Sequence, residues 1–230
     1  MTTIACFHAH HSNIKLIEQA LASYSVELVH YVDPGLDRLK HDEDFNSTLV
    51  REKVNQTLQW MSRCHADAIL VTCTLFAAVL EQMQPLPIPV TGIDDSLLAM
   101  ISRHPKQYLL AFTNPATVEP TMDRYREYLD RHGAEEDKPE LESVLLPGLF
   151  DMVMRGDQDG YLAALEEALH QLALERKDTC LVAAQLSMAP AAEQASLSAG
   201  VTIYTPLSAL GPTLEREIGI KPLNFGGMKS

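Results

Sequence analysis

Basic residues are scarce in this sequence, where 18 Lys and Arg stand against 31 Asp and Glu for a net charge of −13 over 230 residues. Nucleic acids and anionic membranes bind proteins through clustered Lys and Arg, so neither is expected as a partner. The sequence also lacks an apolar run long enough to span a bilayer. Its first residues, MTTIACFHAH, lack the basic and apolar regions of a secretion signal. We therefore expect a cytoplasmic protein, and an anionic substrate would have to be held by local contacts.

Cysteines are few and their spacing indicates neither disulfides nor zinc. They are Cys6, Cys64, Cys73 and Cys180. They form no CxxC motif and no zinc-ligand pattern with histidine, and in a reducing cytoplasm they are expected to stay reduced. The histidine run His8, His10, His11 has no acidic or cysteine ligand at a regular spacing, so we expect no metal site there.

Short runs rich in Val, Ile and Leu alternate with longer segments of helical periodicity. This pattern is typical of βα units around a buried parallel sheet, and it predicts an α/β fold. Strands are expected at 4–8, 26–31, 68–72, 90–93, 108–113, 143–146, 180–184 and 201–204. Helices are expected near 12–23, 45–64, 75–83, 94–103, 117–131, 157–175, 188–198 and 207–217. The polar segment 133–142 is expected to be a surface connection, and the turn-forming Asp33-Pro34-Gly35-Leu36 a turn.

Two pairs of similar segments lie about half the chain apart. Cys6-Phe7-His8 matches Ala111-Phe112-Thr113 at a shift of 105 positions, and residues 71–77 match 183–189 at a shift of 112. General βα repetition can produce this much similarity by chance. Two pairs with nearly equal shifts favour two similar α/β lobes.

A thiol between two hydroxyls follows the apolar strand expected at 68–72. Thr72, Cys73 and Thr74 come directly before a helical segment. Ligands of parallel sheets bind beyond the carboxyl ends of strands, and a helix N-terminus stabilises a thiolate or a carboxylate. Cys73 is therefore a candidate base or nucleophile. The alternative is that Cys73 is a small packing residue at a strand end, which is the commonest role of a cysteine thiol.

Other polar residues also fall at expected strand-to-helix turns, where they could hold a carboxylate or cap a helix. They are Ser12, Thr72, Thr74, Thr113, Thr117 and Ser187. Each taken alone fits a helix cap as well as a ligand contact, but their clustering favours the ligand. His8 is expected to be a polar group of the same substrate site.

Three segments resemble the aspartate/glutamate/hydantoin racemase superfamily. Residues 66–74, ADAILVTCT, resemble its first cysteine motif, residues 113–118, TNPATV, its second-lobe substrate loop, and residues 30–36, HYVDPGL, the loop after its second strand. They follow the family's order over nearly the whole chain. The resemblance implies two pseudo-symmetric lobes, each a mainly parallel sheet flanked by helices, with the active site in the cleft between them.

The resemblance further implies a cofactor-independent enzyme that needs neither PLP nor a metal, and often a homodimer or higher homo-oligomer. We expect residues 1–94 with 206–230 to form the lobe that carries Cys73, and residues 95–205 to form the other lobe. In the racemases, two cysteines face opposite sides of the substrate α-carbon. Here the position of the second cysteine falls on Gln185, in LVAAQLSMA. An amide neither donates nor accepts a proton at useful cost near neutral pH but can hydrogen-bond a carboxylate, so the site is expected to be asymmetric.

Three hypotheses for function remain open. The first is an isomerase or racemase-like enzyme of amino acid metabolism, acting next to the carboxylate of a small amino acid or dicarboxylate. Cys73 would be its base or its nucleophile, as resemblance to the maleate isomerases implies, and His8 or a neighbouring histidine could be a second proton carrier. The second is a decarboxylase with Cys73 as sole proton donor. The arylmalonate decarboxylases that the chain resembles also need only one proton-transfer group, but they keep the opposite cysteine. The third is a noncatalytic protein that binds a small acid.

Overall fold

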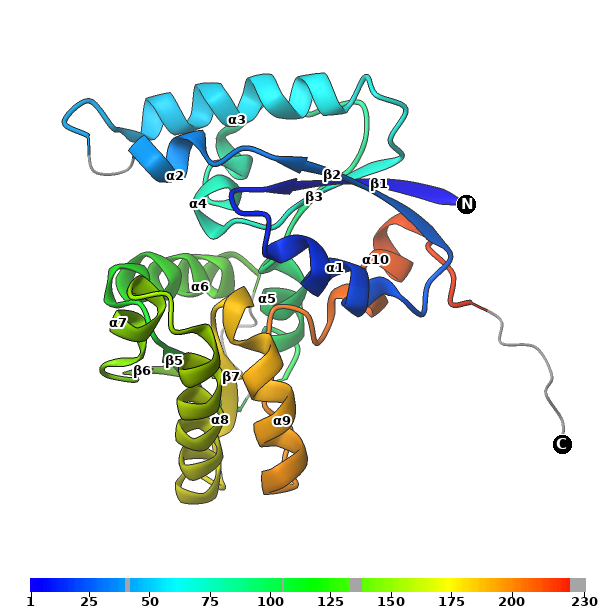
Figure 1. Ribbon diagram of the computed structural model, residues 1–230. Helices are drawn as coiled ribbons and strands as arrows, with labels where there is room; N and C mark the ends of the chain where they lie inside the picture. Colours follow the sequence, from blue (N-terminus) through cyan, green and yellow to red (C-terminus); the bar gives the residue numbers. More distant parts are fainter. Residues whose placement is uncertain (40–41, 105, 133–137, 224–230) are drawn as a thin grey trace, which may run out of the picture. The chain divides into compact units, whose positions relative to one another are not determined.

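The computed structural model describes residues 1–39, 42–104, 106–132 and 138–223. The chain divides into two compact units (Figure 1). Unit 1 comprises Met1–Asp95 with Leu210–Ser230, and unit 2 comprises Ser96–Ala209. Each contains a parallel sheet flanked by helices, which confirms the predicted α/β class. Among the described residues, no helix combines the length and apolar character needed to cross a bilayer.

The sheet of unit 1 has four parallel strands in the order β2-β1-β3-β4. These strands are β1 (Thr2–His8), β2 (Val26–Val32), β3 (Ala68–Val71) and β4 (Val90–Gly92). All residues of β3 are buried, as expected for an inner strand of a sheet covered on both faces. Figure 1 shows α3 on one face of this sheet and α1 and α10 on the other. The residues that follow β1 and β3 therefore share the carboxyl edge of the sheet.

The helices of unit 1 are α1 (Asn13–Leu21), α2 (Gly35–Leu39), α3 (Ser47–Met61), α4 (Thr74–Ala77), the 3-10 helix η1 (Leu80–Gln82) and α10 (Leu210–Ile218). Asn46 caps α3, because its side chain accepts a hydrogen bond of 3.0 Å from the backbone N–H of Leu49. Val50, Val54 and Leu58 recur every four residues on α3, so they line one side of the helix. They pack on alternate residues of β1 and β3 and form the core of that face.

The segment after α10 is hydrogen-bonded to the connection between α1 and β2. The backbone N–H of Ser25 donates to the carbonyl of Lys221 (2.8 Å), and that of Leu223 donates to the carbonyl of Ser23 (2.7 Å). These bonds attach the last described residues to unit 1, although they lie far from its other elements in the sequence.

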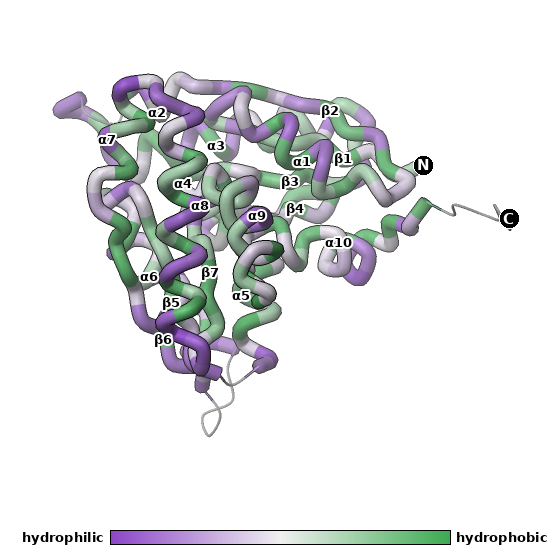
Figure 2. Tube along the Cα trace, turned by 60° about the horizontal axis from the view of Figure 1, so that its bottom comes forward, coloured by the Kyte–Doolittle hydropathy of each residue, from purple (hydrophilic) through white to green (hydrophobic). Residues whose placement is uncertain are grey.

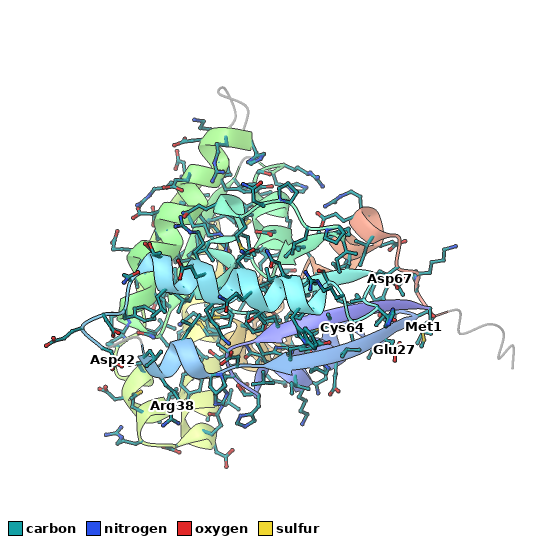
Figure 3. All side chains as sticks on the ribbon, turned by 90° about the horizontal axis from the view of Figure 1, so that it is seen from above. Met1, Glu27, Arg38, Asp42, Cys64 and Asp67 are labelled. Atoms are coloured by element: carbon teal, nitrogen blue, oxygen red, sulfur yellow. The ribbon has the colours of Figure 1, made fainter. Side chains whose placement is uncertain are left out.

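The amino edge of the same sheet is held by acidic side chains. Figure 3 shows Glu27 and Asp67 near Met1, at the start of β1. The backbone N–H of Thr3 donates to Asp67 (2.8 Å), and its hydroxyl donates to Glu27 (2.9 Å). These two hydrogen bonds connect β1 to β2 and to the start of β3, at the edge of the sheet opposite to the expected site.

Unit 2 has a three-stranded parallel sheet in the order β6-β5-β7. Its strands are β5 (Gln107–Phe112), β6 (Glu140–Leu145) and β7 (Cys180–Ala183). The first strand of each unit therefore lies between the second and the third. Tyr204 adds one isolated parallel bridge to Val182 on the free side of β7. This common order supports the repeat inferred from the sequence.

The helices of unit 2 are α5 (Asp95–Ile101), η2 (Pro115–Thr117), α6 (Val118–His132), α7 (Leu149–Met154), α8 (Gln158–Glu175), η3 (Leu186–Met188) and α9 (Ala189–Ala199). Hydrophilic and hydrophobic residues alternate along α8, whereas β7 is hydrophobic (Figure 2). Tyr161, Leu165 and Leu169 recur every four residues on α8 and pack with α9 against one face of the sheet. Residues of α5 and α6 form the core on the other face.

The expected elements agree with the structure to within three residues at each end, with a few exceptions. The strand expected at 201–204 is wrong, because only Tyr204 forms a bridge there. The helix expected at 75–83 is divided into α4 and η1, and the turn expected at 33–36 leads into α2. Helix α7 was not predicted. Within the polar segment 133–142, residues 133–137 lie outside the described residues and 140–142 begin β6.

The strand ladders correct the register of the repeat by one residue. The backbone N–H of Thr72 donates to the carbonyl of Phe7 (2.9 Å), and that of Ala184 donates to the carbonyl of Ala111 (3.0 Å). Phe7 therefore corresponds to Ala111, a shift of 104 instead of 105, while the shift of 112 for the later pair is retained. With the same shift of 104, His8 corresponds to Phe112 and not to Thr113. The difference matters because a slip of one residue moves every side chain to the opposite face of a strand.

Candidate functional site

Cys73 lies directly beyond β3, as the N-cap residue of α4. Its backbone is extended (φ −110°, ψ 124°), and its carbonyl accepts a helical hydrogen bond of 2.9 Å from Ala77. The residue is partly exposed at the carboxyl edge of the sheet. It also packs against the buried core that α3 forms with β1 and β3. Thr74, the first residue of α4, is also partly exposed and offers a hydroxyl beside it.

The other three cysteines differ from Cys73 in position. Cys6 is fully buried in β1, and burial raises the pKa of its thiol to about 12. Cys64 comes before β3, at the amino edge of the sheet, and its thiol contacts the carbonyl of Trp60 (3.3 Å). Cys180 begins β7 in unit 2. Cys73 alone among the four follows a strand and opens a helix.

Thr72, the residue before Cys73, forms a buried pair with His8, the last residue of β1. His8 has no exposed surface and Thr72 is 3% exposed. Nδ1 of His8 lies 2.8 Å from the Thr72 hydroxyl, which also donates to the carbonyl of Phe7 (3.2 Å) and accepts a hydrogen bond from Asn13 (3.4 Å). Both side chains are thus buried and occupied by contacts within unit 1.

His8 is a neutral group at physiological pH. Burial, reinforced by the neighbouring His30, lowers the pKa of His8 to about 4. Burial also lowers the pKa of His30, although Glu18 opposes this effect. His8 therefore offers no positive charge to a carboxylate near pH 7.

Ser12 is exposed just before α1. Its hydroxyl lies 2.8 Å from Nδ1 of His10, and its side chain makes no capping hydrogen bond to α1. The helix-cap alternative for Ser12 is thus not what the structure shows. Ser12 remains a candidate for binding a substrate.

Gln185 joins the loop that follows β5 to the end of β7. Its amide oxygen accepts hydrogen bonds from the backbone N–H of Thr113 (2.8 Å), the Thr113 hydroxyl (2.9 Å) and the N–H of Asn114 (3.3 Å). Its amide nitrogen donates to the Thr117 hydroxyl (3.3 Å). The structure thus brings three of the predicted residues of unit 2 together. Ser187, in η3, is exposed.

Gln185 and Cys73 occupy corresponding positions. Each is the second residue after its strand and the N-cap of the next helix, and the backbone of Gln185 (φ −113°, ψ 138°) is close to that of Cys73. Where unit 1 offers a thiol, unit 2 therefore offers a carboxamide. Three donors converge on its oxygen, an arrangement that also suits a carboxylate oxygen or an oxyanion.

Sequence reasoning missed Asn13, His30, Asn114 and Tyr161 as members of these clusters. Asn114 had a detectable signal, because Asn before Pro at a strand end is typical of a cap, and its side chain accepts from Ala116 (3.0 Å). Tyr161 lies 3.4 Å from the Thr113 hydroxyl and comes from a helix far along the chain. His30 and Asn13 also reach His8 and Thr72 only through tertiary structure.

Replacing Gln185 by leucine is expected to lower the free energy of unfolding by about 1–3 kcal/mol, because two backbone N–H groups and a hydroxyl lose their acceptor. Urea unfolding measures this change. Gln185→Glu keeps an acceptor oxygen and is expected to lose less. Equal losses in the two variants would show that the hydrogen bonds of Gln185 do not stabilise the loop.

Comparison with known families identifies an enzyme family that matches this chain. The family model described as Asp/Glu/Hydantoin racemase matches residues 12–211. The chain belongs to this family. It is a racemase-family enzyme, and membership leaves its specific reaction open. A comparison with curated proteins found no match.

Solved structures share the fold of this racemase-family chain. The Picrophilus torridus aspartate racemase has a TM-score of 0.67 at 14% identity, over 96% of each chain. The Klebsiella pneumoniae allantoin racemase has a TM-score of 0.63 at 16% identity, over 95% of this chain and 88% of its own. An arylmalonate decarboxylase has a TM-score of 0.56 at 14% identity, over 93% and 91%. At these identities the similarity establishes the fold alone. The racemase-family chain shares this fold with racemases and with a decarboxylase.

Proposed function

We propose that this protein moves a proton at the carbon next to a carboxylate of a small amino acid or dicarboxylate, without a cofactor, and that Cys73 is the reacting thiol. The observation that carries the proposal is the partly exposed Cys73 at the N-cap of α4, beyond the carboxyl end of β3. Ligands of parallel sheets bind at this edge. Membership of the Asp/Glu/Hydantoin racemase family supports the same chemistry.

The proposed reaction begins with Cys73 as a thiolate. Its sulfur removes the proton from the α-carbon, and the electron pair of the broken C–H bond moves into the carboxylate to form an enediolate-like intermediate. The Thr74 hydroxyl and the N–H groups of the first turn of α4 are the nearest donors in sequence for the developing negative charge. Return of the proton from Cys73 regenerates the thiolate.

Proton transfer is proposed to be one-sided. In the racemases that the chain resembles, a second thiol serves the opposite face of the α-carbon. The corresponding position here is Gln185, whose amide is neither a useful acid nor a useful base near neutral pH and already bonds Thr113 and Thr117. We therefore expect exchange of the α-proton to be faster than inversion. Gln185, Thr113 and Thr117 are proposed to contribute hydrogen bonds to the substrate or intermediate.

A decarboxylase is the second candidate, and the carboxamide at Gln185 favours it. Decarboxylation of a substituted malonate breaks a C–C bond, releases carbon dioxide and leaves its electron pair on an enediolate-like intermediate. One proton, from the Cys73 thiol, completes the product, so a single proton donor is sufficient. The structural similarity to an arylmalonate decarboxylase is compatible with this alternative.

The test is proton exchange in deuterium oxide across a panel of amino acids, hydantoins and substituted malonates. For an isomerase-type enzyme we expect deuterium to enter at the α-carbon with the configuration largely retained, as mass spectrometry and chiral chromatography would measure. Release of carbon dioxide with one deuterium incorporated would identify the decarboxylase. Tight binding with neither exchange nor release across the panel would contradict both enzymatic proposals and leave the noncatalytic binder.

The proposal includes a cytoplasmic location and assembly into a homodimer or higher homo-oligomer. Light scattering coupled to size-exclusion chromatography measures the assembly. A monomer at all concentrations would contradict that part alone.

A further inference from the structure

A cluster of three potential metal ligands lies on one face of the unit 1 sheet. Cys6 and His8 are two residues apart on β1 and so face the same side, and His30 is the residue of β2 paired with Cys6. Their donor atoms all lie within 4.8 Å of one another. We propose that Cys6, His8 and His30 form a binding site for a thiophilic cation, Zn²⁺ or Cu⁺. The site is separate from the chemistry proposed for Cys73.

The two imidazoles are already in position to share an ion. Nε2 of His8 lies 2.9 Å from Nδ1 of His30, so the two nitrogens face each other. Two nitrogens bound to one tetrahedral Zn²⁺ would be about 3.3 Å apart, given Zn–N bonds of about 2.0–2.1 Å. Shifts of a few tenths of an ångström, about the size of normal side-chain motion, would therefore bring the two nitrogens to this spacing. The hydrogen bond between the rings is the alternative use of the same two atoms.

Each imidazole also has a polar side chain near its other nitrogen, where metal-binding histidines usually have a hydrogen-bond partner. Nδ1 of His8 lies 2.8 Å from the Thr72 hydroxyl. Nε2 of His30 lies 3.7 Å from a carboxylate oxygen of Glu18 on α1. This nitrogen is buried and makes no hydrogen bond, but the Glu18 side chain is 56% exposed and has room to approach. A small movement of Glu18 would complete a carboxylate–histidine–metal arrangement.

The chemistry of the donors selects the ion. One thiolate and two neutral imidazoles suit Zn²⁺ and Cu⁺ and disfavour Mg²⁺ and Ca²⁺, which prefer oxygen ligands. Binding breaks the S–H bond of Cys6, forms a sulfur–metal bond and releases one proton to solvent. Zn²⁺ with the thiolate carries a net positive charge, which the nearby Glu18 carboxylate would offset.

The exposed histidines of the sequence motif are not part of this cluster. The rings of His10 and His11 lie 4.3 Å apart against each other, and His10 is bonded to Ser12. An ion on Cys6, His8 and His30 would join β1 to β2 and, through Thr72, stabilise the residue before Cys73. We therefore assign it a structural role in unit 1.

Cobalt titration of the chelator-treated full-length protein tests the proposal, because Co²⁺ reports a thiolate ligand through a near-ultraviolet charge-transfer band. We expect one Co²⁺ to bind per chain and to give this band, and we expect Zn²⁺ to displace it. An anaerobic titration with Cu⁺ measures the affinity for Cu⁺, and comparison with the affinity for Zn²⁺ shows which of the two ions the site prefers. Glu18→Gln is expected to weaken binding by about 10- to 100-fold, the usual effect of losing an outer-shell partner. Cys6→Ser and His30→Gln are expected to weaken it by more than about 100-fold and to remove the Zn²⁺-induced rise in thermal midpoint.

Matched controls separate this site from other thiols and histidines. Cys73→Ser and His11→Gln are expected to keep both the band and the affinity, which also makes the result independent of the proposed reaction. Circular dichroism of the metal-free variants checks folding, and Glu18→Gln, at an exposed position, provides a reading if Cys6→Ser does not fold. Absence of the band in the wild-type protein, its persistence in Cys6→Ser, or no effect of Glu18→Gln would overturn the proposal.

Discussion

Replacement of Cys73 by serine is expected to lower the rate of α-proton exchange or decarboxylation by about 10²- to 10⁴-fold, the usual contribution of a positioned acid or base. A serine hydroxyl keeps the shape of the side chain, but its pKa is far too high for it to carry the proton near neutral pH. Cys73 is partly exposed, so the fold should tolerate the change. The measurement is deuterium incorporation for the substrate found in the panel.

The matched control for this variant is Cys64→Ser. Cys64 is also partly exposed, but it lies before β3 at the amino edge of the same sheet. Its replacement is expected to leave the exchange rate within about twofold, because surface substitutions away from a site rarely matter. Unchanged turnover in Cys73→Ser, or an equal loss in Cys64→Ser, would remove Cys73 from the mechanism.

Replacement of Gln185 by cysteine is expected to convert one-sided exchange into racemisation. The position has the N-cap backbone geometry of Cys73, and it corresponds to the second cysteine of the racemases that the chain resembles. A second proton carrier should raise the ratio of inversion to exchange by about 10²-fold, the lower end of what acid–base groups contribute. Chiral chromatography of both enantiomeric substrates measures the ratio.

The control for the new thiol is Gln185→Ser. Serine matches cysteine in size and equally removes the hydrogen bonds to Thr113 and Asn114, but it cannot carry the proton. Inversion gained in the cysteine variant alone would show that the thiol is responsible. Equal gains in both variants would mean that release of the loop after β5, and not proton transfer at position 185, controls the stereochemical outcome.

Much of the fold could be predicted from the sequence because its signals are local. Central strands such as β3 are continuous apolar runs, and helices such as α8 have a four-residue period, since one side of each packs on a sheet. The strand expected at 201–204 was wrong because only Tyr204 pairs with β7, and an apolar run does not say how many of its residues pair with a neighbouring strand. Helix α7 was missed because its six residues give too short a periodicity to detect.

The candidate site, like the fold, could be predicted only in part from the sequence. The positions of Cys73 and Gln185 after strands follow from sequence, and the structure places both at N-caps. The burial of His8 could not be predicted, because it depends on the register of β1. A one-residue error in the repeat had aligned His8 with Thr113, and only the strand ladder aligned it with Phe112.

The sequence by itself determined the α/β class, the family and the presence of one thiol where the resembled enzymes have two, because these depend on local pattern and residue identity. Only the tertiary structure decided what the remaining polar groups contact. Strand pairing put His30 beside Cys6 and His8, and the fold of unit 2 brought Gln185 onto the loop of Thr113. These contacts join residues that are 22 or more positions apart, and no sequence periodicity specifies such pairs.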